Sequence, residues 1–200
     1  MCGDNPALLV GVAAGGGAEG GWDDAAVTDV PGPAADPLPN PPGIHVGLAP
    51  TIRVANKAII IRDGHLLVTV NTGPFQTFYL CPGGGQEHGE DAYVALRREC
   101  REEIGCDVEV GAFAFLRDYV SADHEFAAQQ GGHHQQESFF FCTLAPGAEP
   151  RLTDEADDWQ TGVAWLPVDG LAHEPLWPKA LAGWLASSEA DRPRYLGNVN

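Results

Sequence analysis

Three glutamates lie close together in the segment 90–105, EDAYVALRRECREEIG. On an α-helix Glu99, Glu102 and Glu103 fall at positions i, i+3 and i+4, so their carboxylates gather on one flank. Hard divalent cations take oxygen ligands from carboxylates and from backbone carbonyls. The glycine-rich turn 83–85 lies just upstream and offers such carbonyls. These residue types therefore point to a divalent-cation site.

A simpler explanation of the same segment is a solvated charged helix face with local arginine partners, such as Arg98 with Glu102. A helical wheel, however, places Glu103 only about 20° from Leu96, inside the apolar arc. A carboxylate near a core is costly unless it is paired or bound to a metal. The position of Glu103 therefore favours a functional site.

The wider spacing of charged residues and glycines forms a recognisable pattern, G-x5-E-x7-R-E-U-x-E-E-x-G-U, in which U is a bulky aliphatic residue. Its seven fixed positions are occupied by Gly84, Glu90, Arg98, Glu99, Glu102, Glu103 and Gly105. This pattern resembles the Nudix box of the Nudix (MutT-like) hydrolases. Both U positions are cysteines, Cys100 and Cys106, which are small hydrophobes and should loosen the packing slightly without changing the chemistry. The resemblance extends over residues 51–187.

The resemblance implies a fold of the α/β (α+β) class, an αβα sandwich with a mixed β-sheet. It implies hydrolysis of a nucleoside diphosphate linked to another group, with Mg²⁺ or Mn²⁺ as the cofactor. The implied metal ligands are the Gly84 carbonyl and the side chains of Glu99, Glu102 and Glu103. Arg98 would orient these carboxylates, and Glu90 would hold the turn into the helix or bind the metal indirectly.

The general base stays open in this interpretation. It is either a box glutamate or a carboxylate from a later strand or loop. Glu137 is the best candidate outside the box, as base or as additional metal ligand; otherwise it is an ordinary strand-edge glutamate. The implied catalytic residues are thus Glu99, Glu102, Arg98 and Glu137. His124, His133 and His134 lie in a polar loop, 121–136, where one of them could contact a substrate phosphate.

The substrate also stays open, between (d)NTPs, ADP-ribose and another nucleotide sugar. Phe78, Tyr79 and Phe139 could stack on a base, although strand positions favour the core. Two other function classes remain: a nucleotide sensor on the same fold that cleaves nothing, and an isoprenoid-diphosphate isomerase that would use Cys81.

Hydrophobic patterning predicts the elements that must position this segment. Runs rich in β-branched and aromatic residues predict strands at 53–61, 65–70, 75–80, 108–120, 137–144 and 162–166. The Asp63-Gly64 pair predicts a tight hairpin. A helix is expected over 90–104, ending at Gly105, and a second one over 179–186, after Pro178.

The overall charge limits the possible partners. The chain of 200 residues has 28 acidic residues against 11 Lys and Arg, a formal net charge of −17. This balance argues against a nucleic-acid backbone or an anionic membrane as a partner. An acidic protein that handles an anionic substrate needs a cation to mediate, and the resemblance implies that this substrate is a small-molecule nucleotide. A homodimer stays open, because Trp165, Trp177 and Trp184 could serve an interface or the core.

The organisation of the chain changes near residue 50. Residues 1–50 contain 8 of the 16 prolines, 10 of the 25 glycines and no Lys or Arg, a composition expected to be disordered. The Nudix-like domain is expected over 51–187 and a C-terminal tail over 188–200. The five cysteines are widely spaced and include no C-x-x-C pair, which leaves a zinc knuckle or a thioredoxin-like site unsupported. We expect reduced thiols and a cytoplasmic location.

Overall fold

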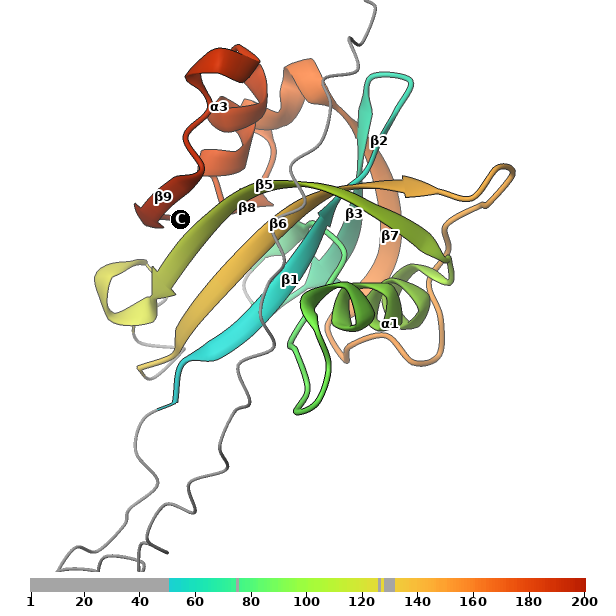
Figure 1. Cartoon of the computed structure of the whole chain (residues 1–200), viewed down its shortest axis with the longest axis horizontal. Coiled ribbons are helices and arrows are strands. Elements are labelled where there is room, and N and C mark those ends of the chain that lie inside the picture. The colour runs from blue at the N-terminus through green and yellow to red at the C-terminus, as the bar shows by residue number, and fades with distance from the viewer. Residues whose placement is uncertain (1–50, 75, 126, 128–131) are drawn as a thin grey trace, which may run out of the picture. The chain divides into compact units, whose positions relative to one another are not determined.

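The computed structural model describes residues 51–74, 76–125, 127 and 132–200; the expected disordered segment 1–50 lies outside the described residues. This part of the chain contains two α-helices, nine strands and three short 3-10 helices, Ser121–Asp123, Val168–His173 and Glu189–Asp191. Figure 1 shows how these elements are arranged. In chain order the α-helices and strands are β1 (Arg53–Ile59), β2 (Ile61–Arg62), β3 (His65–Thr72), β4 (Thr77–Leu80), α1 (Ala92–Ile104), β5 (Val108–Val120), β6 (His134–Leu144), β7 (Gln160–Pro167), β8 (Leu176–Trp177), α3 (Ala180–Ala186) and β9 (Tyr195–Asn198).

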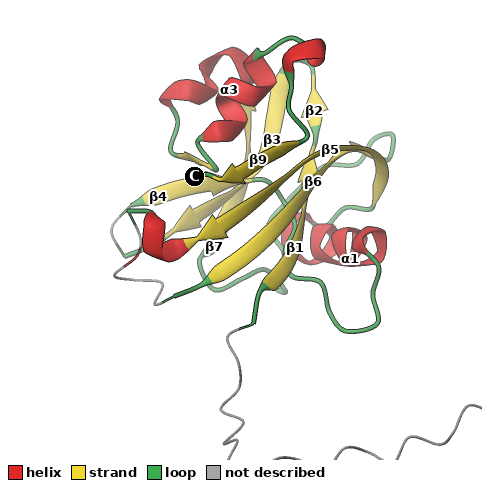
Figure 2. Ribbon diagram, turned by 60° about the vertical axis from the view of Figure 1, so that its left-hand side comes forward, coloured by secondary structure: helices red, strands yellow, loops and turns green. Residues whose placement is uncertain are grey.

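The strands form two mixed sheets. One has the order β1-β6-β5-β9, and the other has the order β2-β3-β4-β8, with β7 paired to β3. Pairs β1–β6, β5–β9 and β4–β8 are parallel and the others are antiparallel. Helices α1 and α3 lie on different sides of the sheets (Figure 2). The expected α/β (α+β) class with a mixed sheet is confirmed.

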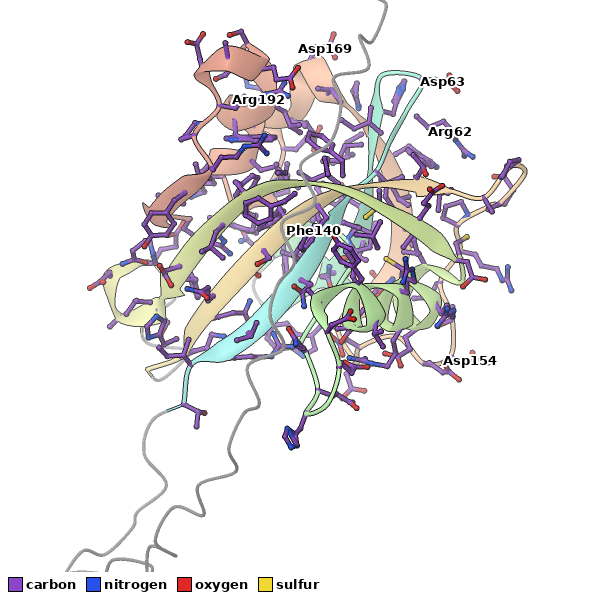
Figure 3. All side chains as sticks on the ribbon, in the orientation of Figure 1. Arg62, Asp63, Phe140, Asp154, Asp169 and Arg192 are labelled. Atoms are coloured by element: carbon purple, nitrogen blue, oxygen red, sulfur yellow. The ribbon has the colours of Figure 1, made fainter. Side chains whose placement is uncertain are left out.

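Both faces of the central strands are buried. Along β1 and just after it, Ile59 joins one apolar cluster, while Ala58 and Ile60 join another. The first cluster packs under α3 and contains Phe115, Phe139, Trp184 and their neighbours. The second contains the inward stripe of α1, Leu96, Cys100 and Ile104, together with Phe140, which is labelled in Figure 3. Burial on both faces explains why Ala58, Ile59 and Ile60 form a continuous apolar run, although Asn56 and Lys57 just before them are polar.

The predicted hairpin after β2 is present. Asp63 and Gly64 both have positive φ, 50° and 74°, as a tight two-residue turn requires. Strand β6 begins at His134, three residues before the predicted start, because it pairs with both β1 and β5. His134 was therefore wrongly placed in a loop.

The segment 188–200 contributes structure of its own. Strand β9 pairs with β5 through Leu116 and Tyr195. Trp177 and Trp184 are both buried, whereas Trp165 is half-buried under the Arg62 guanidinium, 4.4 Å from the ring centroid. None of the helices in the described part of the chain is long and apolar enough to span a membrane.

Candidate active site

Helix α1 carries most of the candidate residues, and the local sequence determines where it begins and ends. The Asp91 carboxylate accepts hydrogen bonds from the backbone N–H groups of Tyr93 and Val94, both at 2.9 Å, and thereby caps the first turn. Gly105 ends the helix in the left-handed conformation, with φ 63°. Leu96, Cys100 and Ile104 bury one face of the helix, so the polar flank faces the glycine-rich loop.

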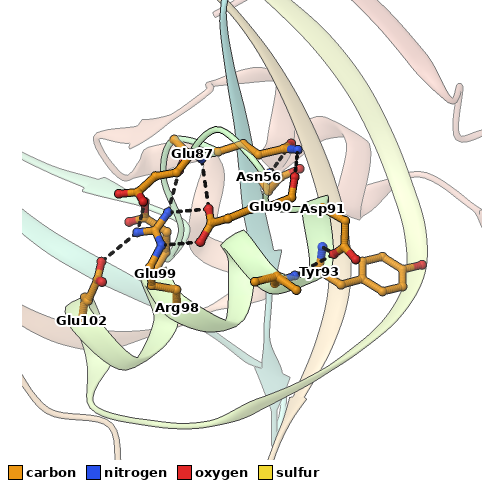
Figure 4. A network of polar contacts seen from close by, with 11 residues as sticks. Asn56, Glu87, Glu90, Asp91, Tyr93, Arg98, Glu99 and Glu102 are labelled. Carbon is orange, nitrogen blue, oxygen red and sulfur yellow. Dashed lines mark hydrogen bonds and ion pairs between the residues drawn. The ribbon is translucent and has the colours of Figure 1, made fainter.

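Arg98 is the centre of the polar flank (Figure 4). Its Nε and Nη2 donate to the two carboxylate oxygens of Glu90, at 2.8 and 3.0 Å. Its Nη1 donates to both Glu99 and Glu102, each at 3.0 Å. Nη2 also donates to the Gly85 carbonyl at 2.9 Å, which ties the helix to the loop. One guanidinium thus offsets the mutual repulsion of three carboxylates and brings Glu99 and Glu102 together.

Glu90 holds the turn that leads into the helix. Besides Arg98, its carboxylate accepts a hydrogen bond from the Glu87 N–H at 3.0 Å. The hydrogen bonds from Arg98, followed by the one from Glu87, lower the pKa of Glu90 to about 2. Glu90 is therefore an anion at any physiological pH, and its contacts are those of a structural anchor.

The glycine-rich loop runs along the free edge of β1 as an extra strand would. Three backbone hydrogen bonds of 2.8–2.9 Å join them: Ala58 N–H to Pro82 O, Asn56 N–H to Gly84 O, and Gln86 N–H to Val54 O. Gly83 has φ +121°, and a Cβ there would lie 2.2 Å from the Asn56 carbonyl oxygen. Only glycine allows the loop to approach β1 this closely.

Gly84 makes room for a carboxylate. A Cβ at this position would lie 2.5–2.7 Å from the three carboxylate atoms of Glu99. Burial, the largest influence, raises the pKa of Glu99 even though Arg98 opposes it. The Gly84 carbonyl oxygen keeps a second lone pair beyond its bond to Asn56. The Glu99 carboxylate therefore lies against Gly84 and shares the Arg98 Nη1 with Glu102, and all three residues offer hard oxygen donors.

Glu103 lies deeper than the other two box glutamates. Its side chain is buried, and its Oε2 accepts the Gly83 N–H at 2.7 Å. Burial raises its pKa to about 7, with the positive charge of Lys57 opposing and the carboxylates of Glu99 and Asp157 adding to the rise. Lys57 is itself buried in β1 and donates a hydrogen bond to the Gly83 carbonyl. Both polar groups of the Gly83 backbone are thus held by the two buried charges.

The oxygen donors of the box suit Mg²⁺ or Mn²⁺ in type. No group of three or more His, Cys, Asp or Glu side chains in the described residues already has the geometry of a metal centre. A cation would compete with Arg98 for Glu99 and Glu102, and with the Gly83 N–H for Glu103. The set fits a divalent cation once these contacts rearrange.

Glu137 lies on β6 and is not among the carboxylates that Arg98 binds. It is buried, and its two oxygens accept hydrogen bonds from Arg117 Nε and Gln135 Nε2, both at 2.5 Å. Its role as base or metal ligand stays a prediction.

The three candidate histidines gather near the ends of β5 and β6. The ring of His124 stacks on Tyr119 with centroids 5.0 Å apart, and its Nε2 lies 2.8 Å from Asn198 Oδ1. His133 Nε2 lies 3.3 Å from Gln135 Oε1, and His134 Nε2 lies 3.8 Å from Asp118. Their assignment to a substrate phosphate also stays a prediction.

Apart from Phe78, the remaining candidates are part of the core. Phe139 is 1 % exposed and stacks on Phe115 with centroids 4.3 Å apart, and Tyr79 packs against the same cluster. Phe78 is half-buried beside Gly73. Cys81 is buried as well, and burial raises the pKa of its thiol to about 12.

Sequence reasoning missed residues that reach the box from other elements. Lys57 is the one signal that was visible, because Asn56 and Lys57 interrupt the apolar residues of β1. The segment before β7 and the first residue of that strand gave no such signal. There Thr153 donates to the Glu102 carbonyl, and Gln160 Nε2 donates to the Glu103 carbonyl at 2.6 Å. Asp157 is close enough to Glu103 to raise its pKa.

Comparisons with known proteins agree with this geometry. The sequence model of the NUDIX domain matches residues 52–186. Among curated protein sequences, none matches this chain.

Solved structures with the same fold include several hydrolases. The MutT NUDIX hydrolase from Burkholderia pseudomallei is 23% identical, with a TM-score of 0.55, 69% of this chain covered and 100% of that one. A NUDIX hydrolase from Nitrosomonas europaea is 18% identical, with a TM-score of 0.57 and coverage of 72% and 93%. A UDP-X diphosphatase is 17% identical, with a TM-score of 0.52 and coverage of 76% and 70%. Because the family model matches most of the chain, this chain belongs to the NUDIX domain family.

Proposed function

We propose that the chain hydrolyses the pyrophosphate bond of a nucleoside diphosphate linked to another group, with Mg²⁺ or Mn²⁺. The observation that carries this proposal is the convergence of Glu99, Glu102 and the Gly84 backbone, organised by Arg98. In a chain of net charge −17, a diphosphate would be repelled by these carboxylates alone. A divalent cation removes that conflict.

In this mechanism the box residues either hold the cation or keep its ligands in place. Glu99, Glu102 and the Gly84 carbonyl would hold the cation, and Glu103 would join them on leaving the Gly83 N–H. A bound cation would neutralise charge on the phosphoryl oxygens and lower the pKa of a water molecule. Arg98 keeps Glu99 in place, and Glu90 keeps Arg98 in place. Burial raises the pKa of Glu99, which makes this carboxylate a stronger proton acceptor than an exposed glutamate.

The substrate class is a nucleotide, with (d)NTPs, ADP-ribose and other nucleotide sugars as the candidates. The neighbouring structures include both a MutT-type protein and a UDP-X diphosphatase, which supports testing both groups. An isomerase that uses Cys81 is disfavoured, because its buried thiol stays protonated and is a poor nucleophile.

The test is a phosphate-release assay over (d)NTPs, ADP-ribose, NADH, UDP-sugars and dinucleoside polyphosphates, with Mg²⁺, Mn²⁺ or EDTA. We expect metal-dependent hydrolysis of at least one compound. Glu102→Gln should abolish it with the fold intact, whereas Glu109→Gln, the same change at an exposed position of β5, should not. Saturable nucleotide binding without any product would instead indicate a sensor. No product and no binding would refute the proposal.

A further inference from the structure

The inner face of the first sheet carries a row of polar side chains at the end nearest the glycine-rich loop. Strands β1, β6 and β5 pair so that Arg53 lies opposite Gln135, and Arg117 opposite Glu137. Gln135, Glu137 and Arg117 are each less than 8 % exposed. Buried polar groups are costly unless they are hydrogen-bonded. None of these three residues belongs to the Nudix box, so the box does not explain why they are polar.

The hydrogen bonds in the row converge on the Glu137 carboxylate. Arg117 Nε donates to one oxygen of Glu137, and Gln135 Nε2 donates to the other. Because a carboxylate only accepts, the Gln135 amide must present its N–H side to Glu137. Its carbonyl oxygen therefore faces the other way, where it accepts a hydrogen bond from Arg53 Nη1 at 2.5 Å. The buried pair Arg117–Glu137 thus fixes Gln135, and Gln135 fixes Arg53.

Arg53 is held against the glycine-rich loop itself. Its Nη2 and Nε lie 2.7 and 3.0 Å from the place that a Cβ at Gly85 would occupy. Gly85 follows the candidate ligand Gly84, and its carbonyl accepts the hydrogen bond from Arg98. The Arg53 guanidinium therefore lies against Gly85, the residue that directly follows the proposed cation ligand Gly84.

The charge of Arg53 distinguishes it from the other cations around the loop. Arg98 is bound to three carboxylates, Arg117 to Glu137, and Lys57 is buried beside Glu103. Arg53 is exposed, and its partner is a neutral amide. Within the described part of the chain, no carboxylate lies within 4.0 Å of its guanidinium.

An exposed guanidinium with an unneutralised charge suits an anion, and its planar fork matches two oxygens of one phosphate group. We infer that Arg53 binds the diphosphate of the substrate directly, and that Gln135, Glu137 and Arg117 are positioning residues that act through it. This inference rests on the proposed function, because the diphosphate is the substrate group that the proposed cation site holds.

The test compares Arg53→Gln with Arg62→Gln, a matched change at an exposed arginine of the β2–β3 hairpin. Kinetics use the best substrate found in the panel, and calorimetry measures binding of its non-hydrolysable methylene-bridged analogue in Mg²⁺. Loss of a charged hydrogen bond should raise KM and weaken analogue binding roughly 10- to 100-fold, with a smaller change in kcat. Arg62→Gln should match the wild type.

The positioning role is tested with Gln135→Leu, alone and combined with Arg53→Gln. Alone it should weaken analogue binding, and in the Arg53→Gln background it should add little, because its effect passes through Arg53. Additive effects would refute the positioning role. Unchanged affinity in Arg53→Gln, with active wild-type enzyme, would overturn the inference and leave the proposed function standing. A wild type that neither hydrolyses nor binds nucleotides would overturn both.

Discussion

Replacing Gly84 by alanine should separate the activity of this protein from its stability. The added Cβ would lie 2.5 Å from a Glu99 carboxylate oxygen, and an ordinary contact needs at least 3.4 Å. The carboxylate must therefore retreat by about 0.9 Å. Since a misplacement of about 1 Å in a reacting group can reduce the rate about 100-fold, we expect kcat to fall by roughly that factor. The obstacle is the end of a flexible side chain, so the melting temperature should change by less than about 2 °C.

Gly83, one residue earlier, should show the opposite balance. There the added Cβ would meet the backbone oxygen of Asn56 at 2.2 Å, and the residue has φ +121°. The backbone conformation alone costs about 1–3 kcal/mol, and the contact requires β1 or the loop to move as well. A loss of about 3 kcal/mol would lower the melting temperature of a domain of this size by about 10 °C.

The two variants are compared by thermal unfolding and by steady-state kinetics on the same preparation. Gly183→Ala is the control, because Gly183 is exposed in α3, with nothing within 4 Å of the added methyl group. Alanine is the better helix former, so this variant should be about 0.5–1 kcal/mol more stable and fully active. If Gly84→Ala kept wild-type kcat, or lost as much stability as Gly83→Ala, the placement of Glu99 against Gly84 would be refuted.

Two further predictions concern pH. Because the pKa of Glu90 in the folded protein is about 2, its pairing with Arg98 contributes stability above the unfolded pKa near 4.5, and this contribution disappears as the pH falls towards 2. Arg98→Gln should therefore be less stable than the wild type in urea unfolding at pH 6, with the difference shrinking towards pH 2; a constant difference would contradict the pairing. For Glu103 the sign is reversed: a folded pKa of about 7 makes the wild type lose stability as the pH rises from about 4.5 to about 7. In EDTA, the free energy of unfolding of Glu103→Gln should therefore rise relative to that of the wild type by up to about 3 kcal/mol over that range. If the two free energies changed with pH in parallel, the buried carboxyl would not be protonated.

The parts of the fold that depend on local sequence could be predicted. The helix was predicted over 90–104 from the spacing of Leu96, Cys100 and Ile104 and from Gly105 after them. The observed α1 starts two residues later than predicted and ends at the same residue. Asp63-Gly64 indicated the hairpin, since the turn conformation is a property of those two residues. The same helical periodicity placed Glu103 inside the apolar arc, where the structure has it buried.

The parts that depend on distant pairing could not be predicted. Strands β8 and β9 have two and four residues, and they form only because β4 and β5 offer an edge to pair with. Nothing local to Arg98 indicates its bond to Glu90, eight residues away, because that bond requires the loop to fold back. Lys57 and Gln135 likewise acquire their partners only through the register of β1 and β6.

The hydrogen bonds between the glycine-rich loop and β1 also bear on solubility. An exposed strand edge with unpaired N–H and C=O groups is a template for the strand of another molecule. In this protein the loop fills that edge along residues 54–58, so the segment that serves the site also shields the sheet from intermolecular pairing. Damage to this loop should therefore cause aggregation as well as inactivity, and its variants will need to be compared at matched monomer concentration.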